Sequence, residues 1–130
     1  MSEIKQNVWY SKDHEWAEIV DANTIRVGIS YFAQSQLGDI VFVELPEIGL
    51  SVKDSESLGT IESVKTVSDV FSPVAGTVTK VNSDLLDQPE LVNNEPYGQG
   101  WMVELEVEGG AEAAVAGLLT GDEYKAYTEE

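Results

Sequence analysis

The stretch GTIESVKTVSDVFSPVAG, residues 59–76, decides the fold that we predict for this chain. Its side chains alternate in the manner of a β-strand, with Ile61 and Ser63 on one face, and the pattern resumes at Val67. We therefore predict a β-hairpin with Lys65 at the turn. Basic residues are scarce, since lysine and arginine account for 7 residues of the chain and aspartate and glutamate for 24. The presence of Lys65 at this turn therefore calls for an explanation.

A repeat surrounds this hairpin. The pattern Pro-x-x-Gly-x-x-x-Lys occurs in LPEIGLSVK, residues 45–53, and again in SPVAGTVTK, residues 72–80. Three matching positions can recur by chance, but each copy also lies between two strand-like runs. Two similar β units that pack about a pseudo-two-fold axis would bury a shared face. The segment that joins the two units contains Lys65.

The other strands that we predict are short and separated by turn residues. We expect them at residues 8–10, 15–20, 24–30, 39–45 and 101–109. The run 39–45 has too many consecutive apolar residues for a strand with one wet face, and we expect it to be covered on both faces. Side chains alternate along the run 101–109. Those predicted to point inward are Trp101, Val103, Leu105 and Val107. Those predicted to point outward are Glu104, Glu106 and Glu108.

Helices are expected at the periphery. Residues 31–37 form one, with Ser30 as its N-cap and Gly38 at its end. Two more are predicted at 111–119 and 122–127, the second capped by Thr120 or Asp122. We read 82–100 as a polar segment of turns. The chain is thus one mostly β domain, residues 1–130, with a core β region at about 8–108 and a helical tail at about 111–128.

Composition excludes several functions. The formal net charge of −17 argues against nucleic acid or an anionic membrane as a partner, since both attract basic surfaces. The absence of cysteine rules out disulfides and thiolate sites, and His14 is the single histidine. We therefore expect neither a catalytic nor a metal site, and we assign His14 a structural role at a strand start. No signal or transit pattern is visible, which favours the cytoplasm of a bacterium or archaeon and leaves a processed organellar form open.

From these patterns alone, Lys65 has two interpretations. It is either a solubilising charge on a strand edge or a rigidly presented amine that carries a covalent group. Motifs along nearly the whole chain bear on this choice: YSKDHEW at 10–16, a long match over 27–49, ESVKTVSDVFSPVAGTV at 62–78 and LVNNEPYGQGWM at 91–102. Together they resemble the H-protein family of the glycine cleavage system. The tripeptide around Lys65 is Val-Lys-Thr, and it follows Glu-Ser. It differs from the Met-Lys-Met typical of biotin carriers and from the Asp-Lys-Ala of acyltransferase lipoyl domains.

The resemblance implies a barrel-sandwich hybrid of two antiparallel sheets and a covalent cofactor. Lipoate is expected in amide linkage to Lys65, with Glu62, Ser63 and Val64 as the recognition context. Such a carrier takes an aminomethyl group from a pyridoxal-phosphate-dependent glycine decarboxylase to a tetrahydrofolate-dependent aminomethyltransferase. Dihydrolipoamide dehydrogenase then reoxidises it, and a lipoate ligase or octanoyl transferase loads it. The carrier itself performs no catalysis.

The resemblance also implies a cleft that shelters the loaded arm. The positions that match it are Glu15 and Asp69, with Asp13 beside them, and a cationic amine there would attract carboxylates. The alternative for all three is that they are ordinary surface acids. Two rival functions stay open at this point: a relay that donates lipoyl or octanoyl groups to other lipoyl domains, and a binding module that uses an unmodified Lys65.

Overall fold

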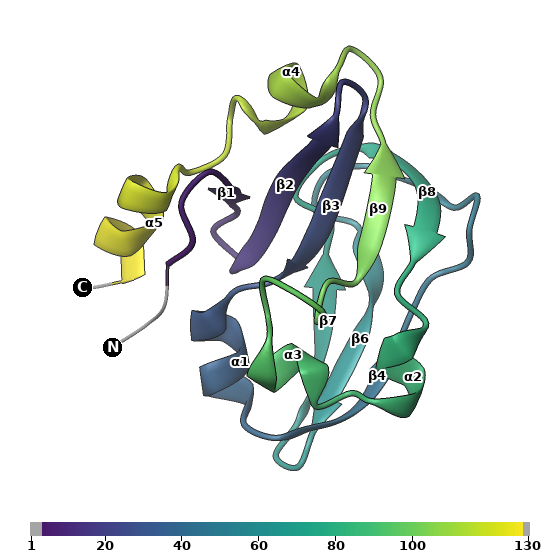
Figure 1. Ribbon diagram of the computed structural model, residues 1–130, viewed down its shortest axis with the longest axis vertical. Coiled ribbons are helices and arrows are strands. Elements are labelled where there is room, and N and C mark those ends of the chain that lie inside the picture. The colour runs from purple at the N-terminus through teal and green to yellow at the C-terminus, as the bar shows by residue number, and fades with distance from the viewer. Residues whose placement is uncertain (1–3, 129–130) are drawn as a thin grey trace.

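Two antiparallel sheets pack face to face in the computed structural model, which describes residues 4–128 (Figure 1). The six-stranded sheet runs, in order, β1 (Trp9–Tyr10), β2 (Glu15–Asp21), β3 (Thr24–Ile29), β9 (Val103–Glu106), β8 (Gly76–Val81) and β5 (Ser51–Val52). The three-stranded sheet runs β4 (Ile40–Glu44), β6 (Ser57–Ser63) and β7 (Val67–Phe71). The predicted mostly β fold is confirmed. The two ends of the predicted domain, residues 1–3 and 129–130, lie outside the described residues.

The hairpin that we predicted is formed by β6 and β7. They pair antiparallel up to Glu62 and Val67, which leaves Lys65 in the turn. Ile61 and Ser63 are buried, whereas Glu62 is exposed, as the alternation predicted.

The two repeat segments pair with each other. Ser51 of β5 lies opposite Thr77 of β8, and the N–H group of Val78 donates to the carbonyl of Leu50 at 2.8 Å. In the repeat, Thr77 corresponds to Leu50 and Val78 to Ser51, so exchanging the two copies turns the pair Ser51–Thr77 into the pair Leu50–Val78. This is the arrangement that a local two-fold axis between the copies requires.

The predicted helices are present, with one shortened. In α1 (Tyr31–Leu37) the Ser30 hydroxyl accepts from the N–H of Ala33, and Gly38 follows with φ 84°. Helix α4 (Ala111–Val115) ends before the predicted 119, because Leu119 pairs with Tyr10 of β1 instead. Helix α5 (Gly121–Thr128) begins with a capping box between Thr120 and Glu123. No helix within residues 4–128 is long and apolar enough to cross a membrane.

Two expectations about strands and turns were wrong. The run 39–45 is not covered on both faces: β4 is an edge strand, and Val41 and Phe42 are half exposed. The polar segment 82–100 also contains two short helices, α2 (Asp84–Asp87) and α3 (Leu91–Asn94), whose single turns are too short to show a period in sequence.

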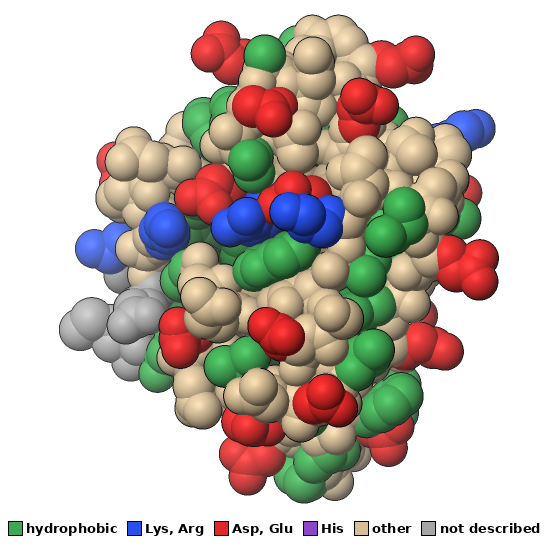
Figure 2. Space-filling model, turned by 45° about the vertical axis from the view of Figure 1, so that its right-hand side comes forward, with side chains coloured by type: hydrophobic (Ala, Val, Ile, Leu, Met, Phe, Trp, Pro, Cys, Tyr) green, Lys and Arg blue, Asp and Glu red, His purple; other side chains and the backbone are tan. Residues whose placement is uncertain are grey.

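A row of alternating charges crosses the outer face of the six-stranded sheet. Strand pairing places Lys80, Glu104, Arg26 and Glu18 on one line, and Lys5 continues it with its ammonium 3.7 Å from Glu18. Figure 2 shows a row of basic side chains with acidic ones beside it on this side of the molecule.

Glu104 points to the outer face of the sheet, as predicted, but it is not exposed to water. It is 7% exposed, and its carboxylate lies 2.7 Å from the guanidinium of Arg26. Arg26 itself lies over the ring of Trp101, at 4.8 Å, and that ring is partly exposed instead of pointing into the core. Val103, Leu105 and Val107 are buried as predicted.

Candidate functional site

One buried hydroxyl closes the turn that presents Lys65. Ser63 is 5% exposed, and its oxygen accepts hydrogen bonds from the N–H groups of Lys65 and Thr66, both at 3.1 Å. The N–H of Ser63 donates to the carbonyl of Thr66 at 2.8 Å. Lys65 is exposed. The lysine backbone is therefore held on the protein side while the side chain points toward water.

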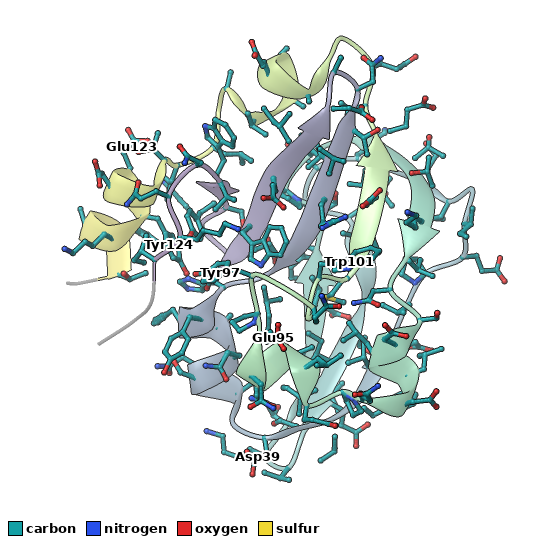
Figure 3. All side chains as sticks on the ribbon, in the orientation of Figure 1. Asp39, Glu95, Tyr97, Trp101, Glu123 and Tyr124 are labelled. Carbon is teal, nitrogen blue, oxygen red and sulfur yellow. The ribbon has the colours of Figure 1, made fainter. Side chains whose placement is uncertain are left out.

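The turn is also tied to the loop that follows α1. The N–H of Val64 donates to the carbonyl of Asp39 at 3.1 Å, and Figure 3 shows Asp39 at the same end of the molecule as the hairpin turn. The side chain of Asn93, from α3, donates to the carbonyl of Gly38 at 2.8 Å and accepts from the N–H of Ile40 at 2.9 Å. Sequence reasoning gave Asn93 no role, although LVNNEPYGQGWM was among the motifs quoted.

A cavity of about 180 Å³ lies between the hairpin, α1 and the start of β2. Three carboxylic acids line it, namely Asp13, Glu15 and Asp69. The apolar part of its wall consists of Ile29, Ala33, Leu37, Ile61 and Val70. The structure thus brings together the three acids that the resemblance assigned to an arm cleft, from segments more than fifty residues apart.

Lys65 lies at one end of the wall that lines this cavity. A β-carbon on Gly38 would lie 3.5 Å from the Cε of Lys65. Gly38 directly follows Leu37, which lines the cavity together with Ala33 one helical turn earlier. A group attached to the lysine would therefore start beside Gly38, directly after the helix that forms part of the cavity wall.

Glu15 is the buried acid of this set, at 3% exposed. Its carboxylate accepts hydrogen bonds from the hydroxyl of Ser11 and, at 3.2 Å, from the N–H of Phe71. Burial raises the pKa of Glu15 from its ordinary 4.5 to about 7, these two hydrogen bonds oppose the rise, and the charge of Asp13 adds to it. A carboxylic acid that titrates near neutrality inside a cavity is characteristic of functional sites.

The C-terminal helix supports the same cavity through Tyr124. The Tyr124 hydroxyl lies 2.8 Å from Nδ1 of His14 and 2.7 Å from the hydroxyl of Ser30, the N-cap of α1 (Figure 3). Its ring stacks on Tyr10 with 4.1 Å between centroids. Burial lowers the pKa of His14, which also lines the cavity. Sequence reasoning missed Tyr124, because nothing in the pattern of α5 shows which residue faces a strand start more than a hundred residues earlier.

Within residues 4–128 no group of three or more histidine, aspartate or glutamate side chains is arranged to hold a metal ion.

A two-sheet β fold with a lysine at a closed hairpin turn is the architecture that the resemblance implied for the biotinyl and lipoyl carrier class. Within that class the chain belongs to the glycine cleavage H-protein family, whose model, "Glycine cleavage H-protein", matches residues 8–130.

Curated relatives and a solved structure agree with this assignment. The chain is 47% identical to a glycine cleavage system H protein of Mycolicibacterium smegmatis over 100% of both chains. It is 50% identical to the H protein of Bacillus velezensis over 93% of each. Its fold matches the crystal structure of a glycine cleavage system H protein from Mycobacterium marinum with a TM-score of 0.88 and 39% identity, over 98% of this chain and 100% of that one.

We expect Ser63→Ala to loosen the lysine turn without unfolding the hairpin. The change removes the acceptor of two backbone N–H groups, and each such bond contributes about 1 kcal/mol. The amides of Lys65 and Thr66 should exchange with deuterium roughly tenfold faster or more. Ser35→Ala, which removes an exposed serine on α1, is the matched control. Unchanged exchange at the turn in Ser63→Ala would show that the hydroxyl does not hold it.

We expect Glu15 to make the stability of the protein depend on pH. The folded state keeps the proton of Glu15 up to about pH 7, whereas the unfolded chain loses it near 4.5. This contribution to stability is therefore complete below pH 4.5, declines as pH rises, and is lost above pH 7. A shift of this size corresponds to about 3 kcal/mol.

The measurement is urea unfolding of the wild type and Glu15→Gln between pH 4 and 8. The variant has no proton to lose at this position, so its stability relative to the wild type should increase with pH across that window. Glu108→Gln, at an exposed acid, should differ from the wild type by a constant amount. A constant difference for Glu15→Gln as well would mean that Glu15 has an ordinary pKa in the folded protein.

Proposed function

We propose that the chain is a lipoyl carrier that moves the aminomethyl group of glycine between enzymes of the glycine cleavage system. The observation that carries this proposal is the cavity beside the Lys65 turn, which combines apolar walls with the carboxylic acids Asp13, Glu15 and Asp69. The family to which the chain belongs supports the same conclusion.

The residues around the cavity fit lipoate as the attached group. Its hydrocarbon chain and dithiolane ring suit the wall that Leu37, Ile61 and Val70 provide, and Lys65 supplies the amine for the amide bond. When bound, lipoate supplies a sulfur that can carry the aminomethyl group and a disulfide that can be reduced and reoxidised.

The protein's own residues would bind and protect the cargo. An aminomethyl group carries a cationic amine, and the carboxylate of Glu15 can accept a charge-assisted hydrogen bond from it. Asp13 and Asp69 add negative charge at the same cavity. The apolar walls would exclude water from the bond between nitrogen, carbon and sulfur, which is prone to hydrolysis. No residue of the chain is required to transfer a proton or form a bond during the transfer.

Four partners follow from this proposal. They are the pyridoxal-phosphate-dependent glycine decarboxylase, the tetrahydrofolate-dependent aminomethyltransferase, dihydrolipoamide dehydrogenase, and a lipoate ligase or octanoyl transferase that modifies Lys65 in the context of Glu62, Ser63 and Val64. The relatives named above are bacterial proteins, which supports the bacterial cytoplasm as the proposed location.

The cavity also favours a shuttle over a relay of lipoyl or octanoyl groups. A relay protein would use the same lysine, but neither acyl group has a positive charge. A buried carboxylic acid such as Glu15 would then only destabilise the fold when ionised. A cationic cargo gives that acid a purpose.

We expect Lys65 to be the single site of lipoylation. Incubation with lipoate ligase, lipoate and ATP should add one lipoyl group to the wild type, as read by intact mass, and none to Lys65→Arg. The matched controls are Lys53→Arg and Lys80→Arg, because both lysines are exposed and end the two repeat copies. A wild type that stays unmodified, or a Lys65→Arg variant that still gains the group, would contradict the proposal.

We expect Glu15→Gln to accept lipoate normally but to lose the aminomethyl group faster. The change keeps the shape of the side chain and removes its charge, and hydrogen bonds to charged groups contribute about 1.5–3 kcal/mol, so the loss rate at pH 8 should rise roughly tenfold or more. The loss rate of the variant divided by that of the wild type should approach one as the pH falls, because Glu15 of the wild type then becomes protonated. Glu108→Gln is the control, and equal loss rates in all three proteins would make Glu15 an ordinary acid.

A further inference from the structure

The outer face of the three-stranded sheet leads directly to Lys65. Strand pairing places Phe42, Glu62 and Val67 in one row across β4, β6 and β7, next to the turn. The second row, one step further from the turn, consists of Glu44, Thr60 and Asp69. We call these six residues the hairpin face.

Large apolar side chains are exposed at the end of this face that adjoins the lysine. Phe42 is 51% exposed and Val67 59%, and Val64, in the turn itself, is 68% exposed. Val41, the extra residue of a bulge in β4, adds another at 49%. Apolar side chains grouped on a protein surface commonly mark a site of interaction with another protein.

The charge of the hairpin face is negative and uncompensated. It carries three carboxylic acids, Glu44, Glu62 and Asp69, and the two ion pairs found among residues 4–128 involve none of them. On the other sheet, by contrast, Lys5, Arg26 and Lys80 alternate with acids along one row. An apolar centre with an acidic border fits a partner surface that has an apolar contact and basic residues around it.

We propose that the hairpin face is the docking surface for the enzyme that attaches the acyl group to Lys65, a protein with a basic border around an apolar contact. This proposal rests on the proposed function, because it presupposes that Lys65 is modified.

The reach of the lysine explains why the acylating enzyme is the occupant. Before modification the reactive atom is Nζ of Lys65, only one side chain away from the turn. An enzyme that acts on it must cover the residues that flank the turn, and Val64, Val67 and Phe42 are the exposed apolar residues there. After modification the reactive sulfur lies at the far end of a long arm, so the later enzymes can act on it without contacting Phe42, Val64 and Val67.

The reaction at this surface is an acyl transfer. The neutral amine of Lys65 attacks the carbonyl carbon of lipoyl adenylate. An amide bond forms, and the bond between that carbon and the phosphate oxygen breaks. AMP leaves, and the amine proton passes to solvent or to a base of the enzyme. The adenylate is made from lipoate and ATP, so no oxidant or reductant is needed.

The test is steady-state lipoylation of the unmodified protein by lipoate ligase with lipoate and ATP, followed by intact mass. The double variant Phe42→Thr with Val67→Thr keeps strand-forming residues and removes the exposed apolar surface. We expect its kcat/KM as a protein substrate to fall roughly tenfold or more, mainly through KM, because buried aromatic contacts dominate interfaces. Val20→Thr, an exposed valine of β2 on the other sheet, should stay within about twofold of the wild type.

A charge variant tests the acidic border separately. Glu44→Lys should lower kcat/KM at low salt, and the difference from the wild type should narrow as salt screens the charges. Glu108→Lys changes the net charge equally at an exposed site outside the hairpin face and should have a smaller effect. Thermal unfolding of every variant separates loss of docking from loss of folding.

The outcomes distinguish the two proposals. If the wild type is lipoylated and the double variant matches it in kcat/KM, the hairpin face is not the docking surface, and the proposed function stands. Defects that appear only in the glycine decarboxylase reaction would likewise overturn the inference, because the face would then serve a later partner. If the wild type is not lipoylated at all, the proposed function fails and the inference with it.

Discussion

The backbone from Ser63 to Thr66 is closed by hydrogen bonds to one buried hydroxyl, and the placement of Lys65 depends on that closure. Strands β6 and β7, which flank this turn, connect it to the rest of the molecule. Ile61 and Val70, which β6 and β7 turn inward, belong to the hydrophobic core and also line the cavity. The lysine and its cavity are therefore built on one rigid hairpin, so an arm attached to Lys65 begins at a defined distance from the site that would receive it.

Glu15 shows how the fold and the site compete. Its burial among apolar residues disfavours the charged form, and the hydrogen bonds from Ser11 and Phe71 offset only part of that penalty. A glutamine here could still accept these hydrogen bonds and would have no charge to bury. The acid makes physical sense if a cation shares the cavity with it, because the pair then replaces the water that burial removed. Under the proposed function, the free energy lost by burying Glu15 at neutral pH is offset by its binding of a cationic cargo.

The outer faces of the two sheets differ in how their charged side chains are paired. The outer row of the six-stranded sheet alternates cations and anions, and the most buried acid there, Glu104, is paired with Arg26. Two ion pairs lie within that row, Lys5 with Glu18 and Arg26 with Glu104. The outer face of the three-stranded sheet combines exposed apolar groups with carboxylates that form no ion pair among the described residues. In a chain of net charge −17, three of the seven basic residues, Lys5, Arg26 and Lys80, thus lie in the outer row of the six-stranded sheet, and none lies on the hairpin face that we propose as a docking surface.

Local patterns in the sequence were sufficient for the hairpin, the repeat, the helix at 31–37 and the position of Lys65, because alternation, turn residues and caps act between neighbours in the chain. The resemblance to a family named the three cleft acids, but only the tertiary structure brought Asp13 and Glu15 next to Asp69, since these contacts join segments far apart in sequence. The same limit explains the errors. Whether Phe42 is covered or Glu104 is exposed depends on which strand and which cation lie beside it. The hydrogen bonds of Asn93 and Tyr124 could not be predicted for the same reason, because a hydrogen bond between distant segments leaves no periodic pattern in the sequence.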